Sequence, residues 1–346
     1  MKNYAYLLIV LLFTATACQN EQEIDQEFNT ENLDQPIILE TVVGKVTTSS
    51  NKPVANASVT YEKNGTTYSS KTNNSGDFDI VIPVGEGELK VYTGTGRLYN
   101  KSLAINVEEG KNLVIDTQDL RLSMVGQIAY LGGDLDSIET VATDAGYALV
   151  EISKADIENN AIMAYDALML NADDYSTQIE SAAFYSNLKS FVETGGSLYV
   201  SSWGLEYLIG NDEYAQDCGT TRTGGFIDDF TICATRSGAP SLSINNTITD
   251  ANFATHMSST TLNLHYELED WMQINTIDTN FWDVLVEDSA QQPLLIKTNG
   301  LYNGVGKINN GVDTPGTIFY ATFQNYTEGS VLPRVDEILE YMVLNM

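Results

Sequence analysis

Short runs of alternating apolar and polar residues fill the chain between residue 38 and about residue 122. Gly, Asn and Asp separate these runs, which include ILETVVGKVTT, DFDIVIPV and KSLAINV. Period-two alternation is typical of half-buried strands, so we expect about seven strands and no helix here. Asn64-Gly65 favours a type I′ hairpin turn, and Ser75-Gly76 precedes the next strand. Residues 38–122 are therefore predicted to form a small antiparallel β-sandwich.

From Met124 onward, strand and helix patterns alternate. The apolar run VGQIAYLGG precedes a predicted helix at 134–145 that ends before Gly146. The runs ALVEIS and YDALMLN lead to an amphipathic helix at 177–193, and the strand SLYVSSW follows it. This alternation predicts an open, doubly wound parallel sheet with helices on both faces.

The end of the chain again shows strand and helix patterns. PLLIKT and GTIFYATFQN read as further strands, and a closing helix is predicted at 332–344. Residues 209–282 show few clear periods, so we expect an irregular insertion with its own short strands. The second domain, including this insertion, is predicted to cover 123–346.

The N-terminal segment 1–17 has the features of an export signal. Lys2 supplies a positive start, residues 6–13 are apolar, and small residues stand immediately before Cys18. This arrangement resembles the lipobox of bacterial lipoproteins, which implies cleavage before Cys18 and lipidation of that residue. An ordinary signal peptide with an incidental Cys18 is the alternative. We expect an outer-membrane lipoprotein that faces the periplasm or the cell surface.

Residues 18–37 are polar and acidic, and they are predicted to be a disordered tether that connects the lipid anchor to the folded domains. The whole chain of 346 residues has 47 acidic and 17 basic side chains, for a net charge of −30. Such a charge repels a phosphate backbone, so nucleic acid is a poor partner. The expected partners are the membrane, through the lipid anchor, and a glycan, peptide or protein ligand.

Two cysteines remain when Cys18 is set aside. Cys218 and Cys233 lie in the insertion, and an exported protein is exposed to oxidising conditions. We therefore expect a disulfide between them, with a reactive thiol pair or a metal site as the alternative.

The landmarks of the first domain come in a specific order. They are a Gly-x-Val run, Pro53 and Val54, Ala57-x-Val59, Thr72, and the run from Ser75 to Phe78. This order resembles the carboxypeptidase regulatory-like domain, which implies a transthyretin-like sandwich that acts as an accessory module. His256 and His265 are the two histidines of the chain, and neither begins a zinc peptidase motif.

The strand motifs of the second domain, YDALMLN, GGSLYVSSWGLEYL, GTIFYATFQN and ILEYMVL, resemble the class I glutamine amidotransferase-like group. The resemblance implies a flavodoxin-like sheet with any site at the carboxyl ends of its parallel strands. Catalytic members carry a Cys on a tight strand-to-helix turn and a His after a later strand. Here Ser202 and Trp203 follow SLYVS, and Gln324 stands where the base is expected. The catalytic pair is therefore expected to be lost.

Acidic residues gather at the same predicted edge, where they could bind calcium or serve as a general acid–base pair. The simpler interpretation is helix capping, with Asp134 as an N-cap and Ser137 in the first turn. The predicted ligand pocket comprises Asp134, Asp136, Asp173, Asp174, Ser202, Trp203, Glu206 and Gln324.

These patterns favour a lipid-anchored envelope protein that binds or scaffolds without catalysis, and no cofactor is expected other than a possible calcium ion. The alternative is an envelope hydrolase that uses Ser202 or paired carboxylates, although Ser202 lacks the Gly-x-Ser-x-Gly elbow. A third interpretation is a structural component whose pocket is filled by Trp203 and tyrosine side chains.

Overall fold

The computed structural model describes residues 36–171, 180–210, 224–227, 232–236, 241–266, 271–298, 315–327, 330–331 and 334–346. Ile38–Met346 is one compact unit, and Met1–Ile37 is a separate one. Cys18 and most of the predicted tether lie outside the described residues. Within the described part of the chain, no helix combines the length and apolar character needed to span a membrane.

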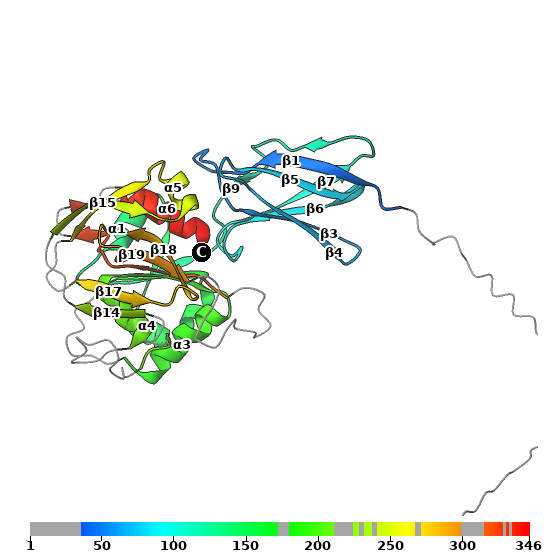
Figure 1. Cartoon of the computed structure of the whole chain (residues 1–346). Helices are drawn as coiled ribbons and strands as arrows, with labels where there is room; N and C mark the ends of the chain where they lie inside the picture. Colours follow the sequence, from blue (N-terminus) through cyan, green and yellow to red (C-terminus); the bar gives the residue numbers. More distant parts are fainter. Residues whose placement is uncertain are drawn as a thin grey trace, which may run out of the picture. The chain divides into compact units, whose positions relative to one another are not determined.

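The first domain is a β-sandwich (Figure 1). One sheet has four antiparallel strands in the order β4 (Thr66–Lys71), β3 (Ser58–Lys63), β6 (Gly85–Tyr92) and β7 (Asn100–Val107). The other has the order β5 (Asp77–Pro83), β1 (Leu39–Lys45) and β8 (Leu113–Val114). A two-stranded sheet joins β2 (Thr47–Thr48) and β9 (Arg121–Leu122). The predicted sandwich is confirmed, with parallel pairing at β1–β8 and β2–β9 as a departure from a purely antiparallel fold.

Alternation along the strands explains how the sandwich buries its core. In β5, Phe78, Ile80 and Ile82 are buried, whereas the residues between them point outward and are exposed. At the β3–β4 turn, Asn64 and Gly65 both have positive φ, of 52° and 77°, as a type I′ turn requires. The hairpin predicted from this pair is confirmed.

The second domain is built on a nine-stranded sheet, five of whose strands are parallel. Their order is β11 (Leu149–Ile152), β10 (Ile128–Leu131), β12 (Ala167–Leu170), β13 (Ser197–Ser201) and β20 (Ile318–Ala321). In chain order this is 2-1-3-4-5, the flavodoxin-like order. The predicted doubly wound sheet is therefore confirmed.

Helices cover both faces of the parallel sheet. The strand residues Ile128, Met169 and Phe319 pack in one cluster with α1 (Ile138–Asp144), α5 (Ala251–His256) and α6 (Val335–Asn345). Their neighbours Ala129, Leu168 and Ile318 pack in a second cluster with residues of the remaining helices. These helices are α2 (Lys154–Glu158), η2 (Ala161–Ala164), α3 (Ala182–Glu193) and α4 (Glu206–Ile209), the last directly preceded by η3 (Ser202–Leu205).

Four antiparallel strands extend this sheet beyond β20, in the order β19 (Pro293–Thr298), β18 (Trp282–Glu287), β15 (Ser241–Ile248) and β16 (Thr261–Tyr266). We expected residues 293–298 to belong to the part of the domain in which strands and helices alternate. Instead, β19 pairs antiparallel with both β18 and β20. The five residues between β18 and β19 are too few for a crossover, so these two strands form a hairpin. The predicted insertion is likewise more regular than expected, because β15 and β16 join the main sheet.

Two small two-stranded antiparallel sheets complete the described part of the domain: β14 (Ile232–Arg236) with β17 (Met272–Ile277), and β21 (Tyr326–Thr327) with β22 (Ser330–Val331). Cys233 lies buried in β14. Cys218 lies outside the described residues, so the expected disulfide stays a prediction.

Helix ends differ from the predicted ones by a few residues. The helix expected at 134–145 begins after Ser137, which occupies the N-cap, so the expectation that Asp134 caps it is wrong. It ends before Gly146, whose φ of 90° is typical of a residue that terminates a helix. Ser181 caps α3 by accepting a hydrogen bond from the Phe184 amide at 3.2 Å.

Candidate functional site

Ser202 occupies the sharp turn between β13 and the helical residues that follow it. Its φ of 42° lies in the left-handed region, which costs a non-glycine residue about 1–3 kcal/mol. Its side chain has no solvent-exposed surface. The Ser202 carbonyl accepts a hydrogen bond from the Tyr320 hydroxyl at 3.0 Å, so a residue of β20 holds the turn in place.

Gln324 contacts Ser202 directly. Its Nε2 donates a hydrogen bond to Ser202 Oγ at 3.0 Å, and the glutamine is only 2% exposed. The structure thus brings together the two residues that stand in the nucleophile and base positions of the amidotransferase-like pattern. A carboxamide takes up no proton at physiological pH, whichever of its ends faces the hydroxyl, so Gln324 cannot activate Ser202.

No imidazole or carboxylate of the described residues forms a hydrogen bond with Ser202 Oγ. His256 Nε2 lies 3.0 Å from the Glu337 carbonyl oxygen, at a different place in the fold. The side chain of His265 lies outside the described part of the structure. The contacts of Ser202 therefore provide no general base.

Asp136 is 2% exposed and serves as a buried hydrogen-bond acceptor. Its carboxylate accepts from the Ser137 amide at 2.8 Å, the Asn325 amide at 2.9 Å and Asn325 Nδ2 at 2.8 Å. Asn325 Oδ1 in turn accepts from the Tyr199 hydroxyl at 2.6 Å. Burial raises the pKa of Tyr199 well above its ordinary value, so this hydroxyl stays protonated as a donor. Asp136 thus joins the loop after β10 to the loop after β20.

Asn171, directly after β12, is another buried side chain that hydrogen-bonds to a neighbouring element. It was not identified as a site residue from the sequence. It has no exposed surface, and its Oδ1 accepts from the Ile138 amide at 3.1 Å. Its Nδ2 donates to Glu139 Oε2 at 2.7 Å. The amide therefore caps the first turn of α1 from a neighbouring strand. The available signal in the sequence was a polar residue directly after the apolar run ALML at 167–170.

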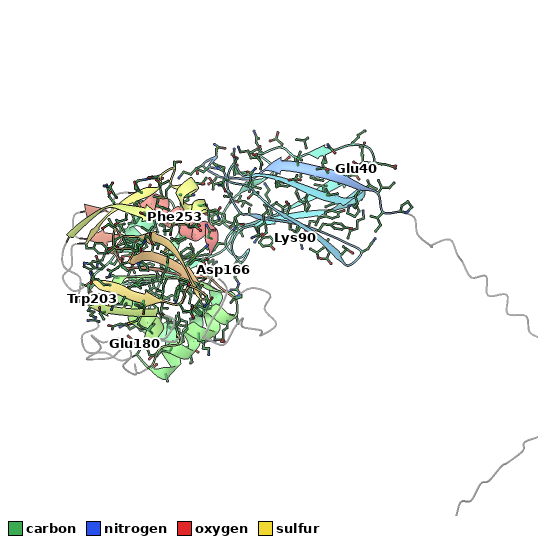
Figure 2. The ribbon with its side chains drawn as sticks, in the orientation of Figure 1. Glu40, Lys90, Asp166, Glu180, Trp203 and Phe253 are labelled. Carbon is green, nitrogen blue, oxygen red and sulfur yellow. The ribbon has the colours of Figure 1, made fainter. Side chains whose placement is uncertain are left out.

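Trp203 and Glu206 meet a residue from the insertion. Arg236 forms an ion pair with Glu206, and its guanidinium carbon lies 4.3 Å from the centroid of the Trp203 ring. Figure 2 labels Trp203 in the α/β domain. The arginine thus neutralises the Glu206 carboxylate and makes a cation–π contact with the tryptophan. Sequence reasoning placed Glu206 and Trp203 in this region but gave no reason to include Arg236.

The remaining predicted pocket residues do not gather here in the described structure. Asp134 is exposed and forms no hydrogen bond or ion pair with a described residue. Asp173 and Asp174 lie outside the described residues. Among the described His, Cys, Asp and Glu side chains, no group of three or more is placed to hold a metal ion.

Comparisons with known proteins agree with the architecture of the first domain. Residues 41–120 match the model of the carboxypeptidase regulatory-like domain. No curated protein matches the chain.

Several solved structures are similar to the chain at low identity. A protein from Thermoplasma acidophilum described as one of the subunits of GMP synthase is 8% identical, with a TM-score of 0.40, and the match covers 63% of this chain and 93% of that one. A ThuA-like protein from Bacteroides uniformis is 11% identical, with a TM-score of 0.35 and coverage of 62% and 89%. The glutaminase domain of Trypanosoma brucei CTPS, with bound acivicin, is 10% identical, with a TM-score of 0.36 and coverage of 64% and 94%. The family match at residues 41–120 identifies a carboxypeptidase regulatory-like domain, and the strand order of the sheet that follows is that of a flavodoxin-like α/β domain.

Proposed function

We propose that this chain is a lipid-anchored protein of the cell envelope that binds or scaffolds without catalysis. The α/β domain would keep an amidotransferase-like architecture while lacking the catalytic pair. The observation that carries this proposal is the hydrogen bond of 3.0 Å from Gln324 Nε2 to Ser202 Oγ, in a place without solvent exposure.

Two physical arguments support a non-catalytic site. A serine nucleophile needs a proton acceptor, and the carboxamide of Gln324 cannot serve as one. A substrate also needs access, yet Ser202, Asp136 and Gln324 are at most 2% exposed. Gln324 Nε2 donates to Ser202, and the Asp136 carboxylate accepts from residues of neighbouring loops, as expected of groups that stabilise a fold; Gln324 Oε1 is buried without a described partner.

Labelling of Ser202 tests this proposal. The purified chain and its Ser202→Ala variant would be treated with a fluorophosphonate and with ester, amide and glycoside reporter substrates. We expect neither protein to be labelled at residue 202 or to turn over a reporter. Turnover or labelling that is present in the wild type and lost in Ser202→Ala would contradict the proposal.

An envelope hydrolase is the second candidate, and one observation favours it. The left-handed backbone of Ser202, between a parallel strand and a helix, has the geometry in which serine nucleophiles are presented. The same labelling experiment decides between the two functions.

Anchoring is proposed from the N-terminal sequence and has its own test. The chain would be expressed in a bacterial host fed with a labelled fatty acid. We expect label in the wild type, which fractionates with membranes, and none in a Cys18→Ala variant. Equal incorporation into both proteins would refute lipidation at Cys18.

A further inference from the structure

A second site lies between loops of the sandwich and the helices α5 and α6. It is a cavity of about 210 Å³. The polar lining residues include Lys52, Asn74, Asn252, His256, Ser258 and Asn345. The apolar lining residues are Pro53, Val54, Ala55 and Leu344. None of these residues belongs to the Ser202 site.

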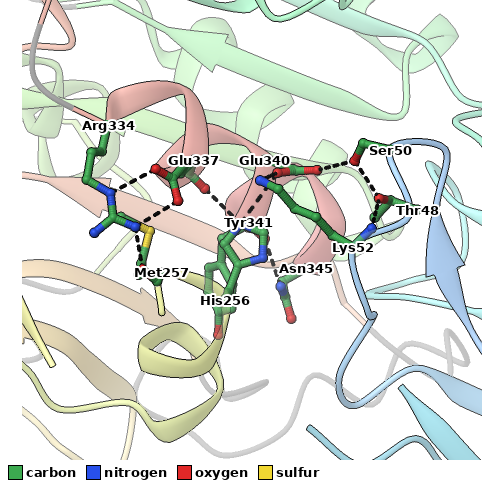
Figure 3. Close-up of polar contacts among 10 residues, drawn as sticks. All are labelled: Thr48, Ser50, Lys52, His256, Met257, Arg334, Glu337, Glu340, Tyr341 and Asn345. Carbon is green, nitrogen blue, oxygen red and sulfur yellow. Dashed lines mark hydrogen bonds and ion pairs between the residues drawn. The ribbon is translucent and has the colours of Figure 1, made fainter. Parts of the chain in front are cut away.

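The charges around this cavity compensate one another (Figure 3). Lys52 forms an ion pair with Glu340. Arg334 donates hydrogen bonds to the Glu337 carboxylate at 2.8 Å and 2.7 Å. These hydrogen bonds lower the pKa of Glu337, which is therefore ionised and paired at neutral pH. Two cations thus pair with two of the nearby carboxylates, and a third carboxylate, that of Asp250, accepts hydrogen bonds from the Phe253 amide and the Tyr341 hydroxyl, so each of these charges already has a partner.

His256 presents a hydrogen-bond acceptor. Its Nε2 lies 3.0 Å from the Glu337 carbonyl oxygen, which can only accept, so Nε2 carries the proton. Burial lowers the pKa of His256, so the ring is neutral near pH 7. Nδ1 is then a lone-pair acceptor, and it has no hydrogen-bond partner among the described residues.

Three carboxamides add acceptors to the same lining. Asn74 donates its Nδ2 to Thr255 Oγ1 at 3.2 Å, and Asn345 donates its Nδ2 to the Tyr341 carbonyl at 2.7 Å. Both retain an Oδ1 without a described partner. The side-chain carboxamide of Asn252, which also lines the cavity, forms no hydrogen bond with any residue that the structure describes. The cavity therefore offers these acceptors beside the donors of Lys52, Ser258 and the carboxamide N–H groups, together with an apolar wall.

We propose that this cavity binds a neutral, hydroxyl-rich small molecule of the size of a single sugar ring. Hydroxyl groups would donate to His256 and the carboxamides, and the C–H face of a ring would contact the apolar wall. The volume agrees with this size, because it is below the range of roughly 300–1,000 Å³ that is typical of pockets for drug-sized ligands.

Binding of simple sugars to the full chain tests the inference. D-glucose, D-galactose and N-acetyl-D-glucosamine would be titrated by saturation-transfer NMR and calorimetry, with D-glucuronate and D-glucosamine as charged comparisons. We expect at least one neutral sugar to bind more tightly than both charged ones. Failure of all three neutral sugars to bind, or preference for a charged sugar, would overturn the inference.

Variants locate the binding. Asn252→Ala should weaken binding about fivefold, as expected for the loss of one hydrogen bond. Ala55→Leu should block the cavity, and Asn106→Ala, at an exposed position in β7, is the matched control that should bind like the wild type. Circular dichroism checks that each variant is folded. Binding that is unchanged in folded Asn252→Ala and Ala55→Leu would place the sugar elsewhere and refute the site.

This inference rests on the proposed binding role but can fail separately from it. Labelling of Ser202 would refute the non-catalytic role, whereas absence of sugar binding with an unlabelled Ser202 would refute the cavity alone.

Discussion

The substitution Asp136→Ala removes a buried carboxylate that the sequence suggested as a ligand-pocket residue and that the structure shows as a hydrogen-bond acceptor. At least three donors lose their acceptor: the Ser137 amide, the Asn325 amide and Asn325 Nδ2, at 2.8 to 2.9 Å. Asn325 has no exposed surface, so water cannot replace the carboxylate without rearrangement.

The magnitude follows from the number of donors. A buried donor left without an acceptor costs about 1–3 kcal/mol, and removal of the carboxylate leaves at least three such donors. We therefore expect Asp136→Ala to lower the free energy of unfolding of the α/β domain by about 3 kcal/mol or more. Asp134→Ala is the matched control, because Asp134 is an exposed carboxylate two residues away; its effect should be within about 0.5 kcal/mol.

Urea unfolding, followed by tryptophan fluorescence, measures both variants against the wild type. Repeating the measurement with millimolar calcium separates the structural role from metal binding, because a ligand that binds only the native state raises its stability. We expect calcium to leave the unfolding curve unchanged. Equal effects of the two substitutions, a loss below about 1 kcal/mol in Asp136→Ala, or stabilisation by calcium that disappears in this variant would refute the reasoning.

Three further substitutions test other parts of the structure. Burial holds the pKa of the His256 imidazole below its ordinary value of 6.5, so near that pH the unfolded chain takes up a proton more readily than the folded one. The free energy of unfolding should therefore fall as the pH is lowered through 6.5, and it should fall less in His256→Gln. Urea unfolding at a series of pH values would show this difference. Lys52→Ala should cost at most about 0.5 kcal/mol, since the ion pair of Lys52 with Glu340 has a lysine side chain that is 42% exposed, and a salt titration of the unfolding free energy would check this. Gly316→Ala should destabilise by about 2 kcal/mol or more, because the added Cβ would stand 1.7 Å from the Gly196 carbonyl oxygen; thermal unfolding measures this loss.

Local patterns in the sequence were sufficient for the elements that depend on local chemistry. The Asn64-Gly65 turn requires two positive φ angles, which this pair supplies in any context. The parallel strands are buried on both faces and therefore appear as short apolar runs between amphipathic helices. Such signals predicted both domains and the order in which they follow one another.

Contacts between distant residues left no such signal. Asp136 and Asn325 are 189 residues apart, and nothing near either one indicates that they meet. The pairing of β15 with β18 was equally hidden, because only two residue pairs define it, Thr247 with Glu287 and Ile248 with Val286. Ser202 and Gln324 could be placed near each other only through the resemblance to a known family.

The carboxyl edge of a doubly wound sheet usually binds a ligand because loops and helix N-termini leave polar groups there without partners. In this chain, side chains supply those partners: Asn171 accepts from the first turn of α1, and Tyr320 donates to the carbonyl of the Ser202 turn. These partners reduce what a ligand could gain at the edge, where Gln324 Oε1 is a buried acceptor without a described hydrogen-bond partner. The cavity beside α5 and α6 offers more open acceptors, because His256 Nδ1 and Asn345 Oδ1 both lack a described donor. We therefore expect ligand binding by this protein to depend on the cavity more than on the carboxyl edge of the sheet.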